Sequence, residues 1–187
     1  ELQGVGRDVT EQKLSEEKLR AIEWMLSRKP SAIETQQQDY GDLTALNRQG
    51  LILSSAGSET LAGICSEFLR LLDTSSAIYE KNGDYAHGIF ASGWCRLMDC
   101  ASRKLCQTDD NAAALASGKW LCHESCWADC SKRAMETRAP VDIECHGGIR
   151  LYSVPIFSGE EVVGAINFGY GDPPRDPETL KTLADSY

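Results

Sequence analysis

The most informative stretch of the chain is LYSVPIFSGEEVVGAINFGY, residues 151–170. Two runs rich in β-branched and aromatic residues, 149–157 and 162–170, lie on either side of a turn at Ser158-Gly159. Such runs around a glycine-containing turn are typical of two antiparallel strands. The sequence therefore predicts a β-hairpin close to residue 170.

Strand patterns also precede this hairpin. Over 141–145, apolar residues alternate with acidic ones, which places Cys145 on the apolar face at the end of a strand. Farther upstream, residues 77–80 and 85–90 flank Asn82-Gly83, a dipeptide that favours a tight hairpin turn. We therefore expect a second hairpin and one further strand.

Helical patterns surround these strands. Apolar residues recur at helical spacing over 61–72, and Cys65 lies on the apolar face as a small core residue. Asp176 and Pro177 form the start signal of a last helix, and 94–135 indicates short helices and loops. The order predicts an α+β fold with helices packed on an antiparallel sheet.

Composition excludes several classes of function. The chain has 187 residues, 42% of them hydrophobic, and a net charge of −9, which suits a domain with a real core. An acidic surface makes nucleic acid and membrane surfaces poor partners. The sequence shows no apolar run of membrane-spanning length and no signal peptide. We therefore expect a cytoplasmic protein whose eight cysteines are reduced thiols, metal ligands or redox centres.

Seven of the cysteines follow residue 90, and the spacing of three of them favours a metal site. Cys122, Cys126 and Cys130 are four residues apart, so neighbouring thiols would share a face if 121–135 is helical. With thiols from elsewhere in the fold, this predicts a four-cysteine site for zinc or an iron–sulfur cluster. The predicted ligands are Cys106, Cys122, Cys126 and Cys145. The alternative is that these thiols are small buried side chains.

The sequence around His146 suggests a different cofactor. His146 precedes Gly147-Gly148, which would let the backbone approach a flat ligand, and a neutral imidazole is a common axial ligand of haem. The usual haem-attachment motif is absent, so any covalent link would use a single cysteine. Trp94, Trp120 and Trp127 either wall a pocket in this region or fill the core.

Two segments resemble a known family. Residues 152–157 and 163–168, YSVPIF and VGAINF, resemble the closing hairpin of a GAF domain. Together with the cysteine-rich stretch, CHGGI at 145–149 resembles the PocR-like branch of sensory domains. The resemblance covers about residues 40–187 and implies a six-stranded antiparallel sheet with a ligand pocket on one face.

The start of the chain resembles another signalling element. GRDVTEQK, residues 6–13, resembles the end of a PAS domain that runs into a signalling helix. This implies that 1–12 end a PAS domain, that 13–39 form a signalling helix and that 40–187 form the GAF-like domain. Leu19, Ile22 and Leu26 make an apolar stripe that would pack on a second copy or on its own domain.

The order of these segments is similar to PAS–GAF sensor histidine kinases of methanogenic archaea. That resemblance implies a redox- or ligand-sensing domain that holds haem through Cys100 and His146. Its implied partners are its own kinase domain, the flanking PAS domain and a second copy, paired through the terminal helices. The sequence carries no kinase motif, so we expect no catalysis in this domain.

An enzymatic alternative rests on a third resemblance. Free methionine-(R)-sulfoxide reductases are GAF domains with a cysteine just before the closing hairpin, where this chain has Cys145. Cys106 or Cys126 would then act as the resolving thiol. His146-Gly147-Gly148 and Asn167 differ from the acidic residues of that family at the corresponding places.

Overall fold

The fold comes from a computed structural model with side chains. It describes residues 39–72, 74–90 and 92–187, and near the start of the chain residues 13, 15, 16, 19, 20, 22, 23 and 27. The described positions between 13 and 27 are helical, and Leu19 and Ile22 are 58% and 47% exposed. The predicted PAS end at 1–12 lies outside the described residues, as do Leu26 and most of 13–39.

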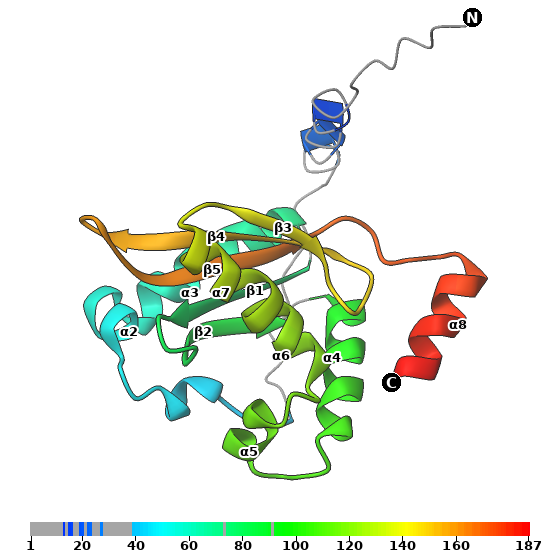
Figure 1. The fold of residues 1–187 in the computed structure, drawn as a ribbon, viewed down its shortest axis with the longest axis horizontal. Coiled ribbons are helices and arrows are strands. Elements are labelled where there is room, and N and C mark those ends of the chain that lie inside the picture. Colours follow the sequence, from blue (N-terminus) through cyan, green and yellow to red (C-terminus); the bar gives the residue numbers. More distant parts are fainter. Residues whose placement is uncertain are drawn as a thin grey trace, which may run out of the picture.

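One antiparallel sheet organises the domain, with the strand order β2-β1-β5-β4-β3 (Figure 1). Both predicted hairpins are confirmed, because β1 pairs with β2 and β4 pairs with β5. β5 is the middle strand and pairs with β1 on its other side. The strands are β1 (Ser75–Glu80), β2 (Tyr85–Phe90), β3 (Val141–Glu144), β4 (Arg150–Ser158) and β5 (Glu161–Tyr170).

The α+β class is confirmed, but the expected six strands are wrong. The described residues form a five-stranded sheet. The patterns in the sequence indicate only these five strands, and the sixth came from the resemblance to GAF domains. Between β2 and β3 the described chain is helical or looped, so this connection adds no strand to the sheet.

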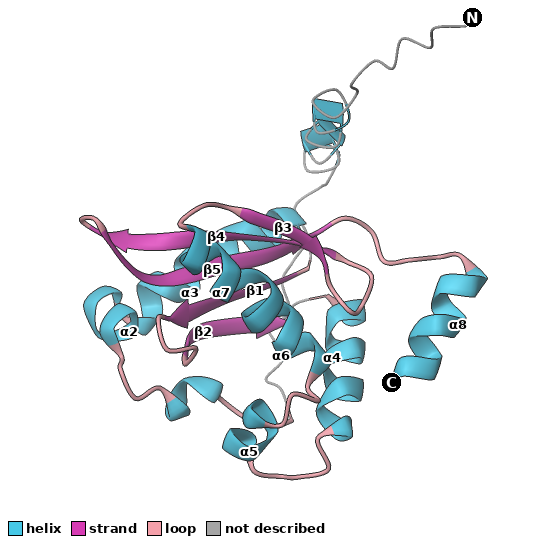
Figure 2. Cartoon of the chain, in the orientation of Figure 1, coloured by secondary structure: helices cyan, strands magenta, loops and turns pink. Residues whose placement is uncertain are grey.

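Helices cover both faces of the sheet (Figure 2). Alternation along β1 separates the two layers, because Ile78 packs in one core cluster and Tyr79 in the other. α2 (Leu51–Ala56) and α3 (Ser58–Leu72) cover the Ile78 face, where Cys65 is fully buried as predicted. The Tyr79 face is covered by α4 (Gly93–Leu105), α5 (Asn111–Ala116), α6 (Leu121–Glu124), η2 (Ser125–Ser131) and α7 (Lys132–Thr137).

The remaining elements lie at the periphery. η1 (Leu43–Leu46) precedes α2, and α8 (Pro177–Ser186) lies beyond the loop that joins β3 to β4 (Figure 1). As predicted, Asp176 caps α8 by accepting a hydrogen bond from the Thr179 amide at 2.8 Å. α8 buries none of its own residues. Among the described residues, no helix combines the length and apolar character needed to cross a membrane.

Candidate functional site

A small cavity lies between the sheet and the helices on its Tyr79 face. Its walls include four cysteines from three separate segments of the chain. Cys95 comes from α4, Cys122 and Cys126 come from α6 and η2, and Cys145 follows β3. The cavity measures about 30 Å³, which is room for one or two water molecules. The other lining residues are Ser75, Trp94, Met98, Gly147, Ile149, Leu151 and Gly169.

The start of α4 positions the first of these thiols. Ser92 is the N-cap, and its hydroxyl accepts a hydrogen bond from the Cys95 amide at 3.1 Å. Cys95 and Met98 are three residues apart and therefore share the helix face that lines the cavity. Trp94 donates from Nε1 to the Gly147 carbonyl at 2.9 Å, which ties α4 to the β3–β4 loop.

A wide helical turn positions the next two thiols. Residues 125–131 form a π-helix, a rare conformation that occurs frequently at functional sites. The Asn167 amide of β5 donates to the Cys126 carbonyl at 3.1 Å and to the Ser131 hydroxyl at 2.9 Å. Because Asn167 is only 1% exposed, these bonds hold both ends of the turn against the sheet.

The β3–β4 loop supplies the fourth thiol and closes the cavity. The Cys145 amide bonds the Ile149 carbonyl at 2.8 Å, and the Gly148 amide bonds the Cys145 carbonyl at 2.9 Å. Ser125 fixes the loop from the helical side, since its Oγ lies 2.6 Å from His146 Nδ1 and accepts from the His146 amide at 3.0 Å. These contacts leave Cys145 and Gly147 facing inward.

Burial keeps the four thiols of this cavity protonated. Desolvation is the largest cause of a raised pKa at all four thiols, Cys95, Cys122, Cys126 and Cys145. Their proximity adds to this, because a thiolate at Cys122 or Cys145 would repel one at Cys126. The four side chains are therefore neutral thiols at neutral pH, and the cavity is an apolar one lined with sulfur.

The predicted four-cysteine metal site is brought together only in part. Cys122, Cys126 and Cys145 line the cavity, whereas Cys106 lies outside it and donates from Sγ to the Ser102 carbonyl at 3.8 Å. Sequence reasoning missed Cys95, although Ser92 is a recognisable N-cap signal. In the part of the chain that the structure describes, no group of three or more His, Cys, Asp or Glu side chains is arranged to hold a metal ion.

The predicted haem pair does not meet in one cavity. Cys100 is half-buried on α4 and does not line the cysteine cavity. His146 faces a separate cavity of about 410 Å³ between the β3–β4 loop and α8. Pockets for ligands of drug size usually measure several hundred Å³, so a haem does not fit the cysteine cavity as it stands. Haem therefore stays a prediction from the resemblance.

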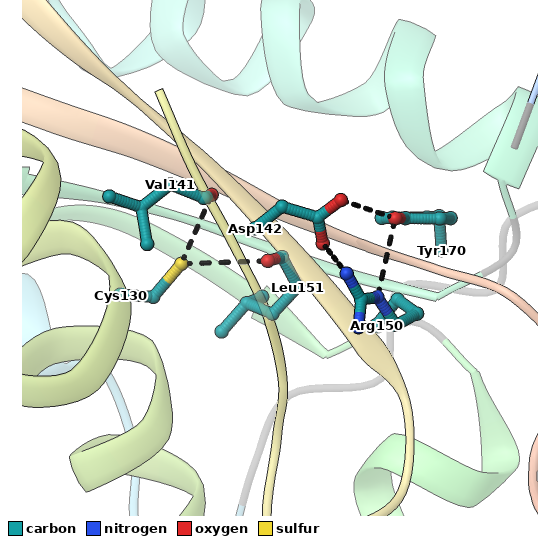
Figure 3. A network of polar contacts seen from close by, with 6 residues as sticks. All are labelled: Cys130, Val141, Asp142, Arg150, Leu151 and Tyr170. Carbon is teal, nitrogen blue, oxygen red and sulfur yellow. Dashed lines mark hydrogen bonds and ion pairs between the residues drawn. The ribbon is translucent and has the colours of Figure 1, made fainter. Parts of the chain in front are cut away.

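Cys130, the last of the evenly spaced cysteines, faces the sheet. Its Sγ donates to the Val141 carbonyl at 3.7 Å and to the Leu151 carbonyl at 3.6 Å (Figure 3). On the neighbouring strands, Arg150 pairs with the Asp142 carboxylate at 2.8 Å, and the Tyr170 hydroxyl donates to the same group at 2.7 Å. This cysteine therefore joins η2 to β3 and β4 and belongs to the core.

The structure brings only one of the two predicted resolving thiols of the reductase alternative next to the same cavity as Cys145. Cys145 shares the cavity with Cys126 but not with Cys106. The raised pKa of the Cys145 thiol opposes the thiolate that a nucleophile requires. The reductase stays a prediction from the sequence.

Comparison with known proteins gives one match. The family described as the sensory domain found in PocR matches residues 57–187, which include α3, the whole sheet and the cysteine cavity. No curated protein and no solved structure matches the chain significantly.

Proposed function

The chain belongs to the family of sensory domains found in PocR, and we propose that it senses a small, largely apolar ligand in the cysteine-lined cavity. The observation that carries this proposal is the convergence of four thiols from three segments on one cavity at one end of β1, β4 and β5. Apolar walls with few polar groups are typical of ligand pockets. Neutral thiols supply such walls here.

A ligand of more than a few atoms would have to widen this cavity. The β3–β4 loop is the part best placed to move, because one side of it lines the cysteine cavity and the other side lines the cavity next to α8. Cys145 borders both cavities. A ligand that binds the widened form better than the closed form would shift the population towards it.

Movement of that loop would reach α8. Gly148 lies so close to Pro174, which leads into α8, that a Cβ atom at Gly148 would come within 2.9 Å of the proline ring. At the other end of α8, burial raises the pKa of the Tyr187 phenol, and the neighbouring Cys122 and Cys145 thiols contribute to this. We therefore infer that α8 carries the signal out of the domain.

A redox role is a second candidate, and the proximity of Cys122, Cys126 and Cys145 favours it. Two of these thiols would form a disulfide by giving two protons and two electrons to hydrogen peroxide, which would be reduced to two water molecules. Neutral buried thiols react slowly with oxidants, and for this reason ligand binding ranks first.

The wider signalling context is also part of the proposal. A histidine kinase domain outside these residues would receive the signal, and two copies would pair through their terminal helices. The PAS-like pattern at 6–13 and the exposed Leu19 and Ile22 side chains support this arrangement. Haem and a metal ion are not part of this proposal, because Cys100 and His146 do not share a cavity and Cys106 lies outside the cavity that holds the other three predicted metal ligands.

Xenon is a suitable probe of the cavity, because it binds dry apolar cavities without any hydrogen bond. The chain has three methionines, and Met98 lines the cavity whereas Met135 lies on α7. With ¹³C-methyl methionine labelling, xenon should shift the Met98 signal and leave the Met135 signal in place. A further probe, Leu183→Met, reports on α8.

Two variants that fill the cavity serve as controls for the xenon experiment. Cys126→Leu should suppress the xenon shift at Met98, and Gly147→Ala should reduce it, because a Cβ atom at Gly147 has ordinary contacts of 3.5 Å or more. A Met98 shift that persists in Cys126→Leu would contradict the proposed site. If the Met98 signal shifts while the signal of the methionine introduced by Leu183→Met does not change, the route through α8 is contradicted.

A further inference from the structure

A second cavity lies on the opposite side of the same helical segment. It measures about 640 Å³ and is bordered by η1, the β1–β2 turn, α5 and the α6–η2 helix. Leu43, Leu115 and Trp127 give it apolar walls, and His123 and Tyr85 reach it from the core. None of the residues proposed above for ligand sensing lines this cavity.

A chain of hydrogen bonds fixes the protonation of His123. The Tyr79 hydroxyl lies 3.0 Å from the Tyr85 hydroxyl, which lies 3.0 Å from His123 Nδ1. Tyr79 is fully buried, and within the described residues Tyr85 is the acceptor for its proton. Tyr85 must therefore donate to Nδ1, and the imidazole carries its own proton on Nε2.

That proton has no acceptor in the described part of the chain. His123 is 5% exposed and lines the second cavity, and its one hydrogen bond there is the one at Nδ1. Desolvation lowers the pKa of the imidazole to about 4, so the ring is neutral at physiological pH. The Nε2–H is thus an uncharged donor that opens on the cavity and has no hydrogen-bond partner among the described residues.

The charges around the opening oppose a strongly charged ligand. Arg48 and Asp84 both line the cavity, and they bring one charge of each sign. The Asp84 carboxylate is held in place by the Arg48 amide at 2.7 Å and the Asn82 side-chain amide at 2.8 Å. The net charge of −9 further disfavours anions.

From this geometry we propose that the second cavity binds a small uncharged molecule with an apolar ring and a carbonyl or hydroxyl oxygen that accepts a hydrogen bond from His123 Nε2. The ring would lie against Trp127. The site shares a wall with the cysteine cavity, since Cys122 and Cys126 line that cavity while their neighbours His123 and Trp127 line this one.

Two probes of nearly the same shape test the hydrogen bond. 4-Fluoroacetophenone carries the carbonyl oxygen, and 4-fluoroethylbenzene lacks it. Titrations followed by ¹⁹F relaxation should show tighter binding of the ketone to the unmodified chain. In His123→Phe, the affinity for the ketone should fall by about five- to tenfold, which corresponds to the loss of one net hydrogen bond. The affinity for the hydrocarbon should stay the same.

A second pair of variants does not depend on the folding of His123→Phe. Ala116 lines the cavity from α5, whereas Ala113 on the same helix does not. Ala116→Trp should abolish binding of the ketone, and Ala113→Trp should leave it unchanged. Equal affinity for the two probes, no binding of either, or full binding by Ala116→Trp would overturn the proposal.

Discussion

The pH dependence of stability tests the burial of the Asp99 carboxylate on α4. Its carboxylate is fully buried and accepts hydrogen bonds from the Tyr40 hydroxyl at 2.7 Å and from Trp120 Nε1 at 2.8 Å. Desolvation nevertheless raises its pKa from the ordinary 3.8 to about 6. The stabilising effect of this carboxyl is complete below pH 3.8 and is lost as the pH rises through 6. That difference corresponds to about 3 kcal/mol of unfolding free energy.

His123 acts in the opposite direction over the same range. Burial lowers its pKa from 6.5 to about 4, so its contribution is present above pH 6.5 and is lost as the pH falls towards 4. This effect also amounts to about 3 kcal/mol. The two effects nearly cancel in the unmodified chain, and a difference between two variants is needed to separate them.

Asp99→Asn provides that difference. An asparagine can accept from Trp120 and donate to the Tyr40 hydroxyl, as a protonated Asp99 would. We expect the unfolding free energy of Asp99→Asn, minus that of the unmodified chain, to rise by about 2.5 kcal/mol from pH 4 to pH 7.5. Urea denaturation at half-unit pH steps measures it.

The control is Asp185→Asn on α8, an exposed position. Its difference curve should be flat within about 0.5 kcal/mol, as is usual for surface substitutions. A flat curve for Asp99→Asn, or one that falls with pH, would refute the assignment of a raised pKa to Asp99 and the burial that causes it.

Three substitutions, with Gly118→Ala as a control for one of them, test the packing of the domain by urea denaturation. Glu80 is fully buried and accepts hydrogen bonds from backbone amides at the start of α2, so Glu80→Ala should lower the unfolding free energy by about 3 kcal/mol; an unchanged midpoint would argue against this network. Gly83 has φ +92°, and a Cβ atom there would lie 2.7 Å from the Trp127 ring, so Gly83→Ala should cost about 3 kcal/mol. Gly118→Ala, with φ +67° and open space, should cost only about 1 kcal/mol, and equal costs would contradict the close packing. Asn167→Ala should cost about 2 kcal/mol and speed amide exchange across η2, and exchange at the original rate would show that the π-helix does not need Asn167.

The sheet could be predicted from the sequence because its signals are local. Alternation over 141–145 and the turns at Asn82-Gly83 and Ser158-Gly159 are all contained in a few residues. The same kind of signal predicted the start of α8 at Asp176, because capping involves only neighbouring residues.

The site could be predicted only in part because its geometry depends on distant residues. The π-helix that orients Cys126 is held by Asn167, 41 residues farther along, and the side on which His146 lies is set by Ser125. Spacing alone could not show that Cys106 lies outside the cavity and that Cys95 lies inside it. The role of His123 likewise needed the positions of two tyrosines in the sheet.

The most direct test of the account is to trap the clustered thiols as disulfides. Slow oxidation of the dilute protein by diamide, which takes up two hydrogens per disulfide, can be followed by digestion and mass spectrometry under denaturing, acidic conditions. The account predicts that Cys145 forms an intramolecular disulfide with Cys95, Cys122 or Cys126, and that Cys100 stays outside this set. Pairing of Cys145 with Cys100, or recovery of Cys145 as a free thiol while other cysteines pair, would contradict it.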